Sequence, residues 1–162
     1  IWSIEFAVTG TIKCGIVDMW LPTIEAIGLS TGFLRPSPDT TVTIPATARK
    51  VLSVGAFNQD AGSMAPFSGR GYTADGRLVP LIVAYGVDVT AAGYGGGYVR
   101  KTGTSFAAPK ISGYAACIME WGIVRRNDEN MYGEKLIAYM TRYAVGIEGE
   151  EMPGIRQGWG LI

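Results

Sequence analysis

Two stretches in the C-terminal half of the chain repeat their apolar residues at helical spacing. Residues 105–122 form the first and residues 130–143 the second, so the pattern predicts a helix over each. The apolar faces are carried by Ile111, Ala115, Ile118, Leu136, Ile137 and Met140. Each helix therefore has one side suited to packing against a core.

Between residues 51 and 101 the apolar runs are short and predict strands. Residues 51–57 and 78–84 are nearly continuous in apolar character, which is typical of strands covered on both faces. Residues 87–91 and 98–101 flank a glycine-rich segment, so they predict a hairpin. These strands all precede the two predicted helices, so one fold is expected to contain both types of element.

The first 44 residues also show β-type patterns. Residues 4–8 and 16–21 have short apolar or alternating runs, and residues 40–44 are rich in β-branched side chains. Prolines and a Ser-Thr-Gly cluster separate these runs as turns. We therefore expect strands over all three runs.

Composition sets limits on size and partners. With 162 residues and 48% apolar content, the chain is long enough for one domain with a real core. Its net charge is zero, which predicts neither a nucleic-acid partner nor an anionic membrane. No signal peptide or membrane-length apolar run is visible, and no compartment is predicted. Because the chain starts at Ile1 without a methionine, it is expected to come from inside a longer protein.

Histidine is missing from the sequence and cysteine is scarce. Without histidine, neither a His-ligated zinc site nor an internal Ser/His pair is possible, and no metal or cofactor is predicted. Cys14 and Cys117 are too few for a disulfide framework. Cys117 lies on the first predicted helix and is expected to be a small core residue.

The strongest local signal is a serine at the start of that helix. Thr104 and Ser105 suit N-cap positions, and Pro109 suits a first turn. A hydroxyl placed there lies beside free backbone amides and the positive helix end, which stabilise a developing oxyanion. Taken alone, the same residues are better explained as a plain helix cap, because serine and threonine are common at that position.

Four segments in order resemble the subtilisin-like serine proteases. Gly103-Thr104-Ser105-x-Ala107-x-Pro109 is similar to the nucleophile motif of that family. The segments 45–56 (Pro-Ala-Thr-Ala-Arg-Lys-Val-Leu-Ser-Val-Gly-Ala), 67–71 (Phe-Ser-Gly-Arg-Gly) and 82–88 (Ile-Val-Ala-x-Gly-Val-Asp) look like the strand and loop signatures that precede it. The resemblance covers roughly residues 40–162 and implies an α/β fold with a parallel sheet.

Further segments resemble one bacterial branch of this family, which includes spore-germination proteases and carries a β-sandwich insert. They are residues 18–22, 33–36, 119–125, 132–135 and 158–160. The branch implies that residues 1–40 are the end of the insert. Residues 41–162 would then be the C-terminal part of the catalytic domain, closed by a tail that packs back on it.

The resemblance also implies roles for individual residues. Ser105 takes the position of the nucleophile, and Ala46 that of a small residue lining the pocket for the side chain before the cleaved bond. Thr102, Gly103 and Thr104 lie beside the nucleophile, where the substrate backbone passes. The family's histidine, aspartate and oxyanion-hole asparagine all lie upstream, and none of them falls within this chain.

These roles predict a serine endopeptidase that acts on peptides or proteins through an acyl-enzyme. The alternative is a pseudoprotease of the same fold that binds or regulates, because some members of the branch are pseudoproteases. The isolated chain is expected to be inactive, because the serine proton has no histidine to accept it. It is also expected to self-associate through the bare edge of the strand at 51–57 and an apolar helix face.

Overall fold

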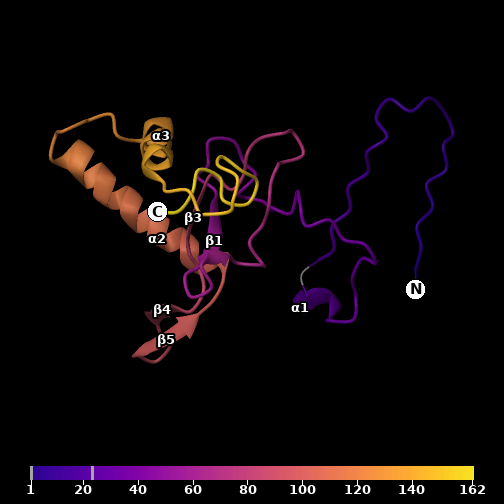
Figure 1. Cartoon of the computed structure of the whole chain (residues 1–162), viewed down its shortest axis with the longest axis horizontal. Coiled ribbons are helices and arrows are strands. Elements are labelled where there is room, and N and C mark those ends of the chain that lie inside the picture. The colour runs from indigo at the N-terminus through magenta and orange to yellow at the C-terminus, as the bar shows by residue number, and fades with distance from the viewer. Residues whose placement is uncertain (1, 23) are drawn as a thin grey trace. The chain divides into compact units, whose positions relative to one another are not determined.

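The computed structural model describes residues 2–22 and 24–162 and divides the chain into two compact units. The units are Ile1–Pro36 and Ser37–Ile162. Figure 1 traces the elements along the chain. The second unit contains every strand assigned among the described residues and both long helices, so it is the part that builds a core.

A three-stranded sheet forms the centre of the second unit. Its strands are β1 (Val54–Asn58), β2 (Ser63–Met64) and β3 (Ile82–Tyr85), in the order β2-β1-β3. The β1 and β3 strands are parallel, with Val54 opposite Ile82, whereas β2 runs antiparallel to β1. Both long strands have buried centres, as their continuous apolar runs predicted.

The edge of β1 that faces away from β3 is covered only at its C-terminal end. There β2 pairs with Phe57 and Asn58. On the same side, the buried Ser68 hydroxyl accepts the Ala56 N–H at 3.0 Å, and the Ala65 N–H donates to the Ala56 carbonyl at 2.9 Å. The expectation of a bare edge at residues 51–57 is therefore wrong for residues 56 and 57, where the loop that follows the strand folds back along it.

The C-terminal tail closes the outer edge of β3, as the resemblance implied. The Val83 N–H donates to the Gly160 carbonyl at 2.9 Å, and the Ile162 N–H donates to the Val83 carbonyl at 3.1 Å. Leu161 also bridges to Val145. The predicted strand at 78–84 begins later, at Ile82, because Pro80 has no N–H to give to a ladder.

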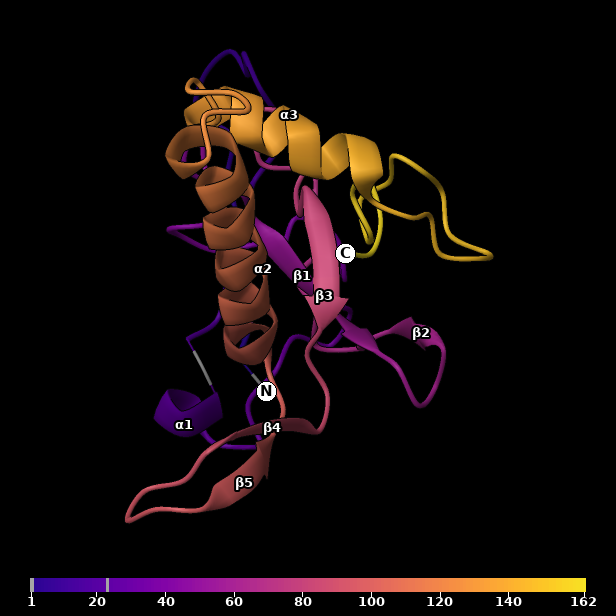
Figure 2. The ribbon, with the colours of Figure 1, turned by 90° about the vertical axis from the view of Figure 1, so that its left-hand side faces the viewer.

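Helices α2 (Thr104–Met119) and α3 (Gly133–Tyr143) pack on this sheet, and α2 continues into a π-helical turn, η1 (Glu120–Val124). Figure 2 shows α2 alongside β1 and β3, with α3 crossing near its end. Both helix predictions are confirmed in place. The second helix starts three residues later than expected, after the Asp128 carboxylate accepts the Asn130 N–H at 3.2 Å.

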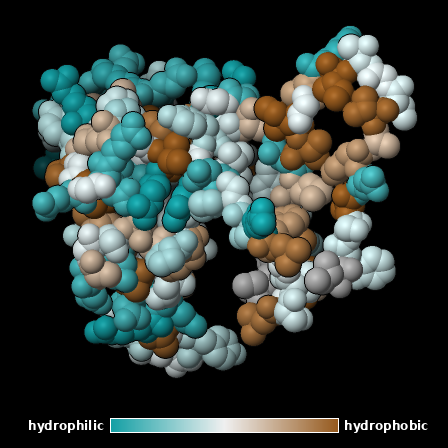
Figure 3. All heavy atoms as spheres, turned by 45° about the vertical axis from the view of Figure 1, so that its right-hand side comes forward, coloured by the Kyte–Doolittle hydropathy of each residue, from teal (hydrophilic) through white to brown (hydrophobic). Residues whose placement is uncertain are grey.

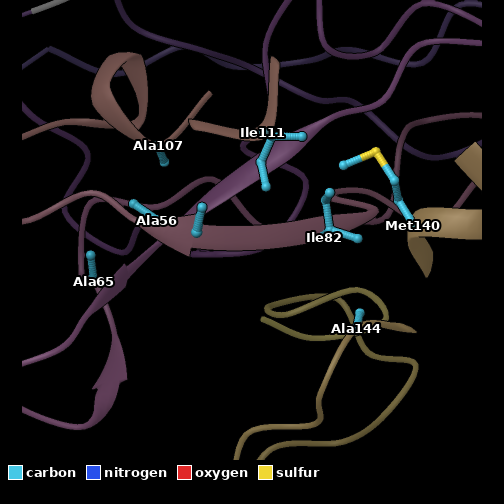
Figure 4. Close-up of a cluster of buried hydrophobic side chains, with 8 residues drawn as sticks. Ala56, Ala65, Ile82, Ala107, Ile111, Met140 and Ala144 are labelled. Atoms are coloured by element: carbon cyan, nitrogen blue, oxygen red, sulfur yellow. The ribbon is translucent and has the colours of Figure 1, made fainter. Parts of the chain in front are cut away.

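The core is made of small and branched side chains from these elements. Figure 4 shows Ala56 and Ile82 from the sheet facing Ala107 and Ile111 of α2, with Met140 of α3 beside them. Each of these five residues is at most 2% exposed. A methionine fills the irregular space where the second helix meets the sheet.

The predicted hairpin is present at the other end of the unit. Strand β4 (Val89–Ala92) pairs antiparallel with β5 (Tyr98–Lys101), and Val89 lies opposite Lys101. The glycine-rich residues between the strands form the turn, in which Gly95, Gly96 and Gly97 all have positive φ. The hairpin leads directly into the loop before α2.

The strand predictions for residues 4–8, 16–21 and 40–44 are wrong in this structure. Among residues 2–22 and 24–44 the only regular element is a short helix, α1 (Ile24–Ile27). A strand exists only when a neighbouring backbone accepts its hydrogen bonds, and these runs have no ladder partner among the described residues. In Figure 3 hydrophobic side chains lie open over the N-terminal unit, and Trp2, Leu29 and Leu34 are at least 82% exposed.

Cys117 is also placed differently from the expectation. It is exposed on α2, as is Cys14 in the first unit. Among the α2 residues only Ala107 and Ile111 are buried, because the sheet covers one side of the helix. Cys117 lies outside the face that Ile111, Ala115 and Ile118 turn toward the core, so its apolar character alone gave the wrong expectation.

Candidate active site

Ser105 is the second residue of α2 and is exposed to solvent. No hydrogen bond of its hydroxyl is found among the described residues. Amides in the first turn of a helix have no intrahelical carbonyl partner, so the Ser105 N–H belongs to a set of donors at the positive helix end. The side chain therefore combines a free hydroxyl with an environment that stabilises negative charge.

The prediction that Thr104 or Ser105 is the N-cap is wrong. Gly103 is the N-cap residue, with φ 154° and ψ 158°, and no side chain caps the helix. That region of backbone space is essentially open to glycine alone, so the loop before the helix depends on Gly103. Because the helix begins at Thr104, the Ser105 hydroxyl is not used for capping.

Pro109 lies in the second turn of α2 rather than the first. A proline has no N–H, so the carbonyl four residues earlier, that of Ser105, receives no helical hydrogen bond from it. The first turn is instead tied to its N-cap, because the Phe106 N–H donates to the Gly103 carbonyl at 3.0 Å.

The loop before Ser105 is fixed to the end of β3. The Gly103 N–H donates to the Gly86 carbonyl at 2.8 Å, and the Gly86 N–H donates to the Phe57 carbonyl at 3.0 Å. A Cβ at Gly86 would lie 2.7 Å from the Ala56 Cβ and 3.0 Å from the Gly103 oxygen. Glycine is therefore required where the sheet meets the start of the helix.

A cavity of about 440 Å³ opens beside Ser105. One side is the start of α2, with Thr104 and Ser105, and the opposite side is the segment from Thr41 to the turn that begins at Pro45. Its lining residues are Thr41, Val42, Thr43, Ile44, Pro45, Ala46, Ser53, Val54, Phe67, Gly69, Pro80, Thr104 and Ser105. We call this cavity the Ser105 groove. Its volume is within the range of small-molecule and peptide side-chain sites.

The structure brings three of the five candidate residues to this groove: Ala46, Thr104 and Ser105. Thr102 and Gly103 are not among its lining residues. Thr102 instead accepts the Asp88 N–H on its hydroxyl at 3.0 Å, which ties the segment before α2 to the end of the sheet. Thr102 and Gly103 therefore fix the segment that leads into the helix carrying Ser105.

Several groove residues were not singled out from the sequence. Segment 41–44 lines the groove because the Thr41 N–H donates to the Arg70 carbonyl at 2.8 Å and the Thr41 hydroxyl accepts the Arg70 N–H at 3.0 Å. Gly69 permits this approach, since a Cβ there would lie 3.2 Å from a methyl of Val42. The β-branched run at 40–44 gave a signal, but it predicted a strand rather than a groove wall.

Lys110 lies close to the aromatic ring of Tyr85. Its ammonium nitrogen is 5.2 Å from the ring centroid, within the range of a cation–π interaction. Tyr85 in turn contacts Phe57, with ring centroids 5.9 Å apart. The ring draws the ammonium toward the sheet.

One carboxyl near the groove has a strongly shifted pKa. Hydrogen bonds from Arg77 and Thr73 lower the pKa of Asp75 to about 2. The side chain is 45% exposed, so solvent screens much of this interaction. Asp75 is therefore ionised at any physiological pH.

The described residues, 2–22 and 24–162, show neither a metal cluster nor a membrane helix. Within that part of the chain no three histidine, cysteine, aspartate or glutamate side chains gather in a way that could hold a metal ion. None of the helices described there has the length and apolar character that a membrane crossing requires.

Comparison with known proteins places the chain in a family. The model of the subtilase family matches residues 30–160. The solved structure of the CspB protease of Clostridium perfringens has 40% sequence identity and a TM-score of 0.78, over 82% of this chain and 29% of that one. The patellamide maturation protease PatA has 30% identity and a TM-score of 0.63, over 77% of this chain and 44% of that one.

Curated relatives agree with these structures. Serine protease AprX of Bacillus subtilis is 32% identical over 104 residues, which are 51% of this chain and 24% of the relative. The C5a peptidase of Streptococcus pyogenes is 33% identical over 99 residues, 61% of this chain and 8% of the relative. The chain thus spans less than a third of these curated relatives. Because the family model matches residues 30–160, which is most of the chain, the chain belongs to the subtilase family.

Proposed function

We propose that this chain supplies the nucleophile and part of the substrate groove of a subtilisin-type serine endopeptidase. The observation that carries the proposal is the exposed Ser105 hydroxyl, which lies at a helix start on the wall of a groove. Family membership adds support, since the relatives include proteins named as serine proteases. Ser105 is the proposed nucleophile, and the substrate is a peptide or protein.

In the proposed reaction the Ser105 oxygen attacks the carbonyl carbon of the scissile peptide bond. A base takes the hydroxyl proton, the carbonyl oxygen becomes an oxyanion, and the Ser105 N–H donates to it. The same base then gives the proton to the leaving amine, which leaves an acyl-enzyme on Ser105. Water releases the acyl group in the second half of the reaction.

The base in this scheme comes from outside the 162 residues. A serine hydroxyl is a weak nucleophile without one, and this sequence contains no histidine. We therefore propose that the full-length protein contributes the histidine, its orienting aspartate and a second oxyanion donor. On the same ground, the isolated chain should have no peptidase activity.

Substrate binding is proposed for the Ser105 groove. Ala46 would form the wall of the pocket for the side chain before the cleaved bond, and Thr104 would lie beside the scissile bond. Thr102 and Gly103 would act by holding the strand-to-helix connection. A small residue at Ala46 leaves the groove open to large side chains.

The test is Ser105→Ala in the full-length protein, with Ser112→Ala as the matched control. Both serines are exposed on α2, but the Ser112 hydroxyl donates to the Ala108 carbonyl at 3.2 Å, as a structural serine does. We expect Ser105→Ala to lower kcat on the order of 10⁴-fold or more, with Ser112→Ala near wild type. Unchanged peptidase activity in Ser105→Ala would show that another residue is the nucleophile.

We also propose that the isolated chain self-associates through apolar surface. Support comes from α2, where Tyr114 is 50% exposed, and from η1, where Trp121 is 43% exposed. Pairing along β1 stays in the proposal only for its N-terminal part, because β2 and Ser68 occupy the edge at residues 56–58. Exposed apolar patches of several hundred Å² are uncommon on monomers. A clean monomer in sedimentation experiments at micromolar concentration would refute it.

The division of the chain near residue 40 is a proposal of the same kind. The boundary between the two compact units, after Pro36, lies close to it. We propose that residues 1–40 belong to an inserted domain and residues 41–162 to the catalytic domain. Limited proteolysis of the full-length protein should then cut preferentially between residues 36 and 41.

A further inference from the structure

The turn that carries Ala46 is held by a single arginine. Pro45 to Ala48 form a tight turn, closed by the Ala48 N–H donating to the Pro45 carbonyl at 2.9 Å. The Arg77 guanidinium donates to the Thr47 carbonyl at 2.7 Å through Nη2 and to the Ala48 carbonyl at 3.3 Å through Nη1. Two adjacent carbonyls of the turn therefore share one cation.

Arg77 is itself fixed by a second turn. Its Nε donates to both carboxylate oxygens of Asp75, at 3.0 and 2.9 Å, and Asp75 accepts the hydroxyl proton of Thr73 at 2.6 Å. The Thr73 hydroxyl also accepts the Arg77 N–H at 2.9 Å. Thr73 is only 8% exposed, so the base of this arrangement is anchored in the protein. A guanidinium held this way is a preorganised fork rather than a free surface charge.

The turn has little apolar packing to hold it in place. On one side it borders the Ser105 groove, and on the other a second cavity of about 450 Å³, which Ala48 and Arg77 help to line. Side chains that border two cavities lose the contacts that a packed core would supply. The turn that carries Ala46 is therefore held by hydrogen bonds from Arg77, and apolar packing contributes little.

We propose that Arg77 is a positioning residue that sets the Ala46 wall of the Ser105 groove. It touches neither Ser105 nor the groove interior, so it acts on substrate fit and not on the chemical step. This inference rests on the proposed peptidase function for its kinetic consequences. Its structural part, that Arg77 orders the turn, stands on the contacts alone.

The variants are Arg77→Ala, Arg77→Lys and the matched control Arg49→Ala. Arg49 contacts the same carboxylate, Asp75, through one 3.4 Å interaction and is 79% exposed. Its loss removes the same charge from the same cluster without touching the turn carbonyls. Lysine at position 77 can reach one carbonyl but cannot form the fork, so it should rescue only in part.

The structural readout is hydrogen exchange at the Ala48 amide, measured by mass spectrometry on the peptide that contains it in the full-length protein. Arg77→Ala should speed this exchange by about two- to tenfold, the factor expected for the loss of one hydrogen bond of ordinary net strength. The exchange rate in Arg77→Lys should lie between those of wild type and Arg77→Ala. The rate in Arg49→Ala should equal that of wild type. Equal rates in wild type and Arg77→Ala would overturn the inference.

The kinetic readout uses the full-length protein. Arg77→Ala should raise KM several-fold and flatten the preference for the residue before the cleaved bond, with kcat within about twofold of wild type. A fall in kcat alone, or the same loss in Arg49→Ala, would overturn the positioning role. If wild type shows no Ser105-dependent hydrolysis, the proposed function fails, and the exchange comparison decides whether Arg77 orders the turn.

Discussion

The two walls of the Ser105 groove are built in different ways. The Ser105 wall is held by backbone hydrogen bonds from Gly86 and Gly103 and by burial of the α2 residues Ala107 and Ile111. It stands directly on the core. A reacting group must stay within a fraction of an ångström of its productive position, and a packed helix start provides that.

The Ala46 wall rests on side-chain charges instead. Its supports, Arg77 and Asp75, are 34% and 45% exposed, and cavities lie on either side of the turn. Such a wall costs less free energy to displace than the helix start does. We call the Ser105 wall the rigid wall and the Ala46 wall the adjustable wall, and we propose that the first carries the chemistry and the second the choice of substrate.

The largest expected effect comes from disturbing the rigid wall with Gly86→Val. Any side chain at Gly86 would meet the Ala56 Cβ at 2.7 Å and the Gly103 oxygen at 3.0 Å, so the sheet and the helix start must separate. We expect the free energy of unfolding to fall by about 3 kcal/mol or more. Urea denaturation of the 162-residue chain measures it.

Gly113→Val is the control for this change. Gly113 lies on α2, where an added Cβ would meet nothing within 4 Å. Valine and glycine differ by only about 0.5 kcal/mol in helix propensity, so stability should hardly change. Similar losses for both variants would mean that the helix start is not packed as described.

A smaller effect, on specificity alone, is expected from Ala46→Phe in the full-length protein. The larger side chain occupies space in the Ser105 groove. It should lower kcat/KM for substrates with large residues before the cleaved bond by about 1–3 kcal/mol relative to alanine substrates. Ratios of kcat/KM across a peptide series measure it. An unaltered preference profile would remove Ala46 from the substrate pocket.

The smallest expected effect is a pH dependence of the stability that Asp75 contributes through its pairing with Arg77. Because the folded pKa of Asp75 is about 2, below its ordinary 3.8, its contribution to stability is complete above pH 3.8 and is lost as pH falls toward 2. The stability difference between wild type and Asp75→Asn should therefore shrink as pH falls from about 4 to about 2.

Asp128 has a pKa that is also lowered, through its contact with Lys135. Asp128 is present in wild type and in Asp75→Asn. Its contribution therefore cancels when the unfolding free energy of one is subtracted from that of the other. Arg77, Arg49 and Thr73 are the groups that face Asp75. If the stability difference between wild type and Asp75→Asn stays constant with pH, Asp75 is not paired with Arg77 in solution.

Sequence patterns predicted the fold where each element meets its partner within the chain. The runs at 51–57 and 78–84 became β1 and β3, and the hairpin and both helices appeared close to their expected bounds. Residues 4–8 and 16–21 carry equally good strand patterns and form none. Apolar alternation reports the preference of a segment, whereas a strand also needs a neighbouring backbone.

For the candidate site, local motifs predicted the Ser105 wall better than the Ala46 wall. The glycine, serine and proline of residues 103–109 lie together in sequence, so their pattern alone indicates a helix start. Arg77 and Thr47 are 30 residues apart, and their contact depends on how two turns fold against each other. No single-sequence pattern reports such a contact, so Arg77 was not a candidate until the structure placed it.

The most direct test of the account is labelling of the full-length protein with a fluorophosphonate, followed by peptide mapping. An activated serine attacks this reagent and keeps the phosphonyl group on its oxygen, whereas an ordinary serine does not react. We predict a stoichiometric adduct on Ser105 and none on Ser112, with labelling abolished by Ser105→Ala. An adduct on another serine, or no adduct in a protein that hydrolyses peptides, would contradict the assignment of Ser105 as the nucleophile.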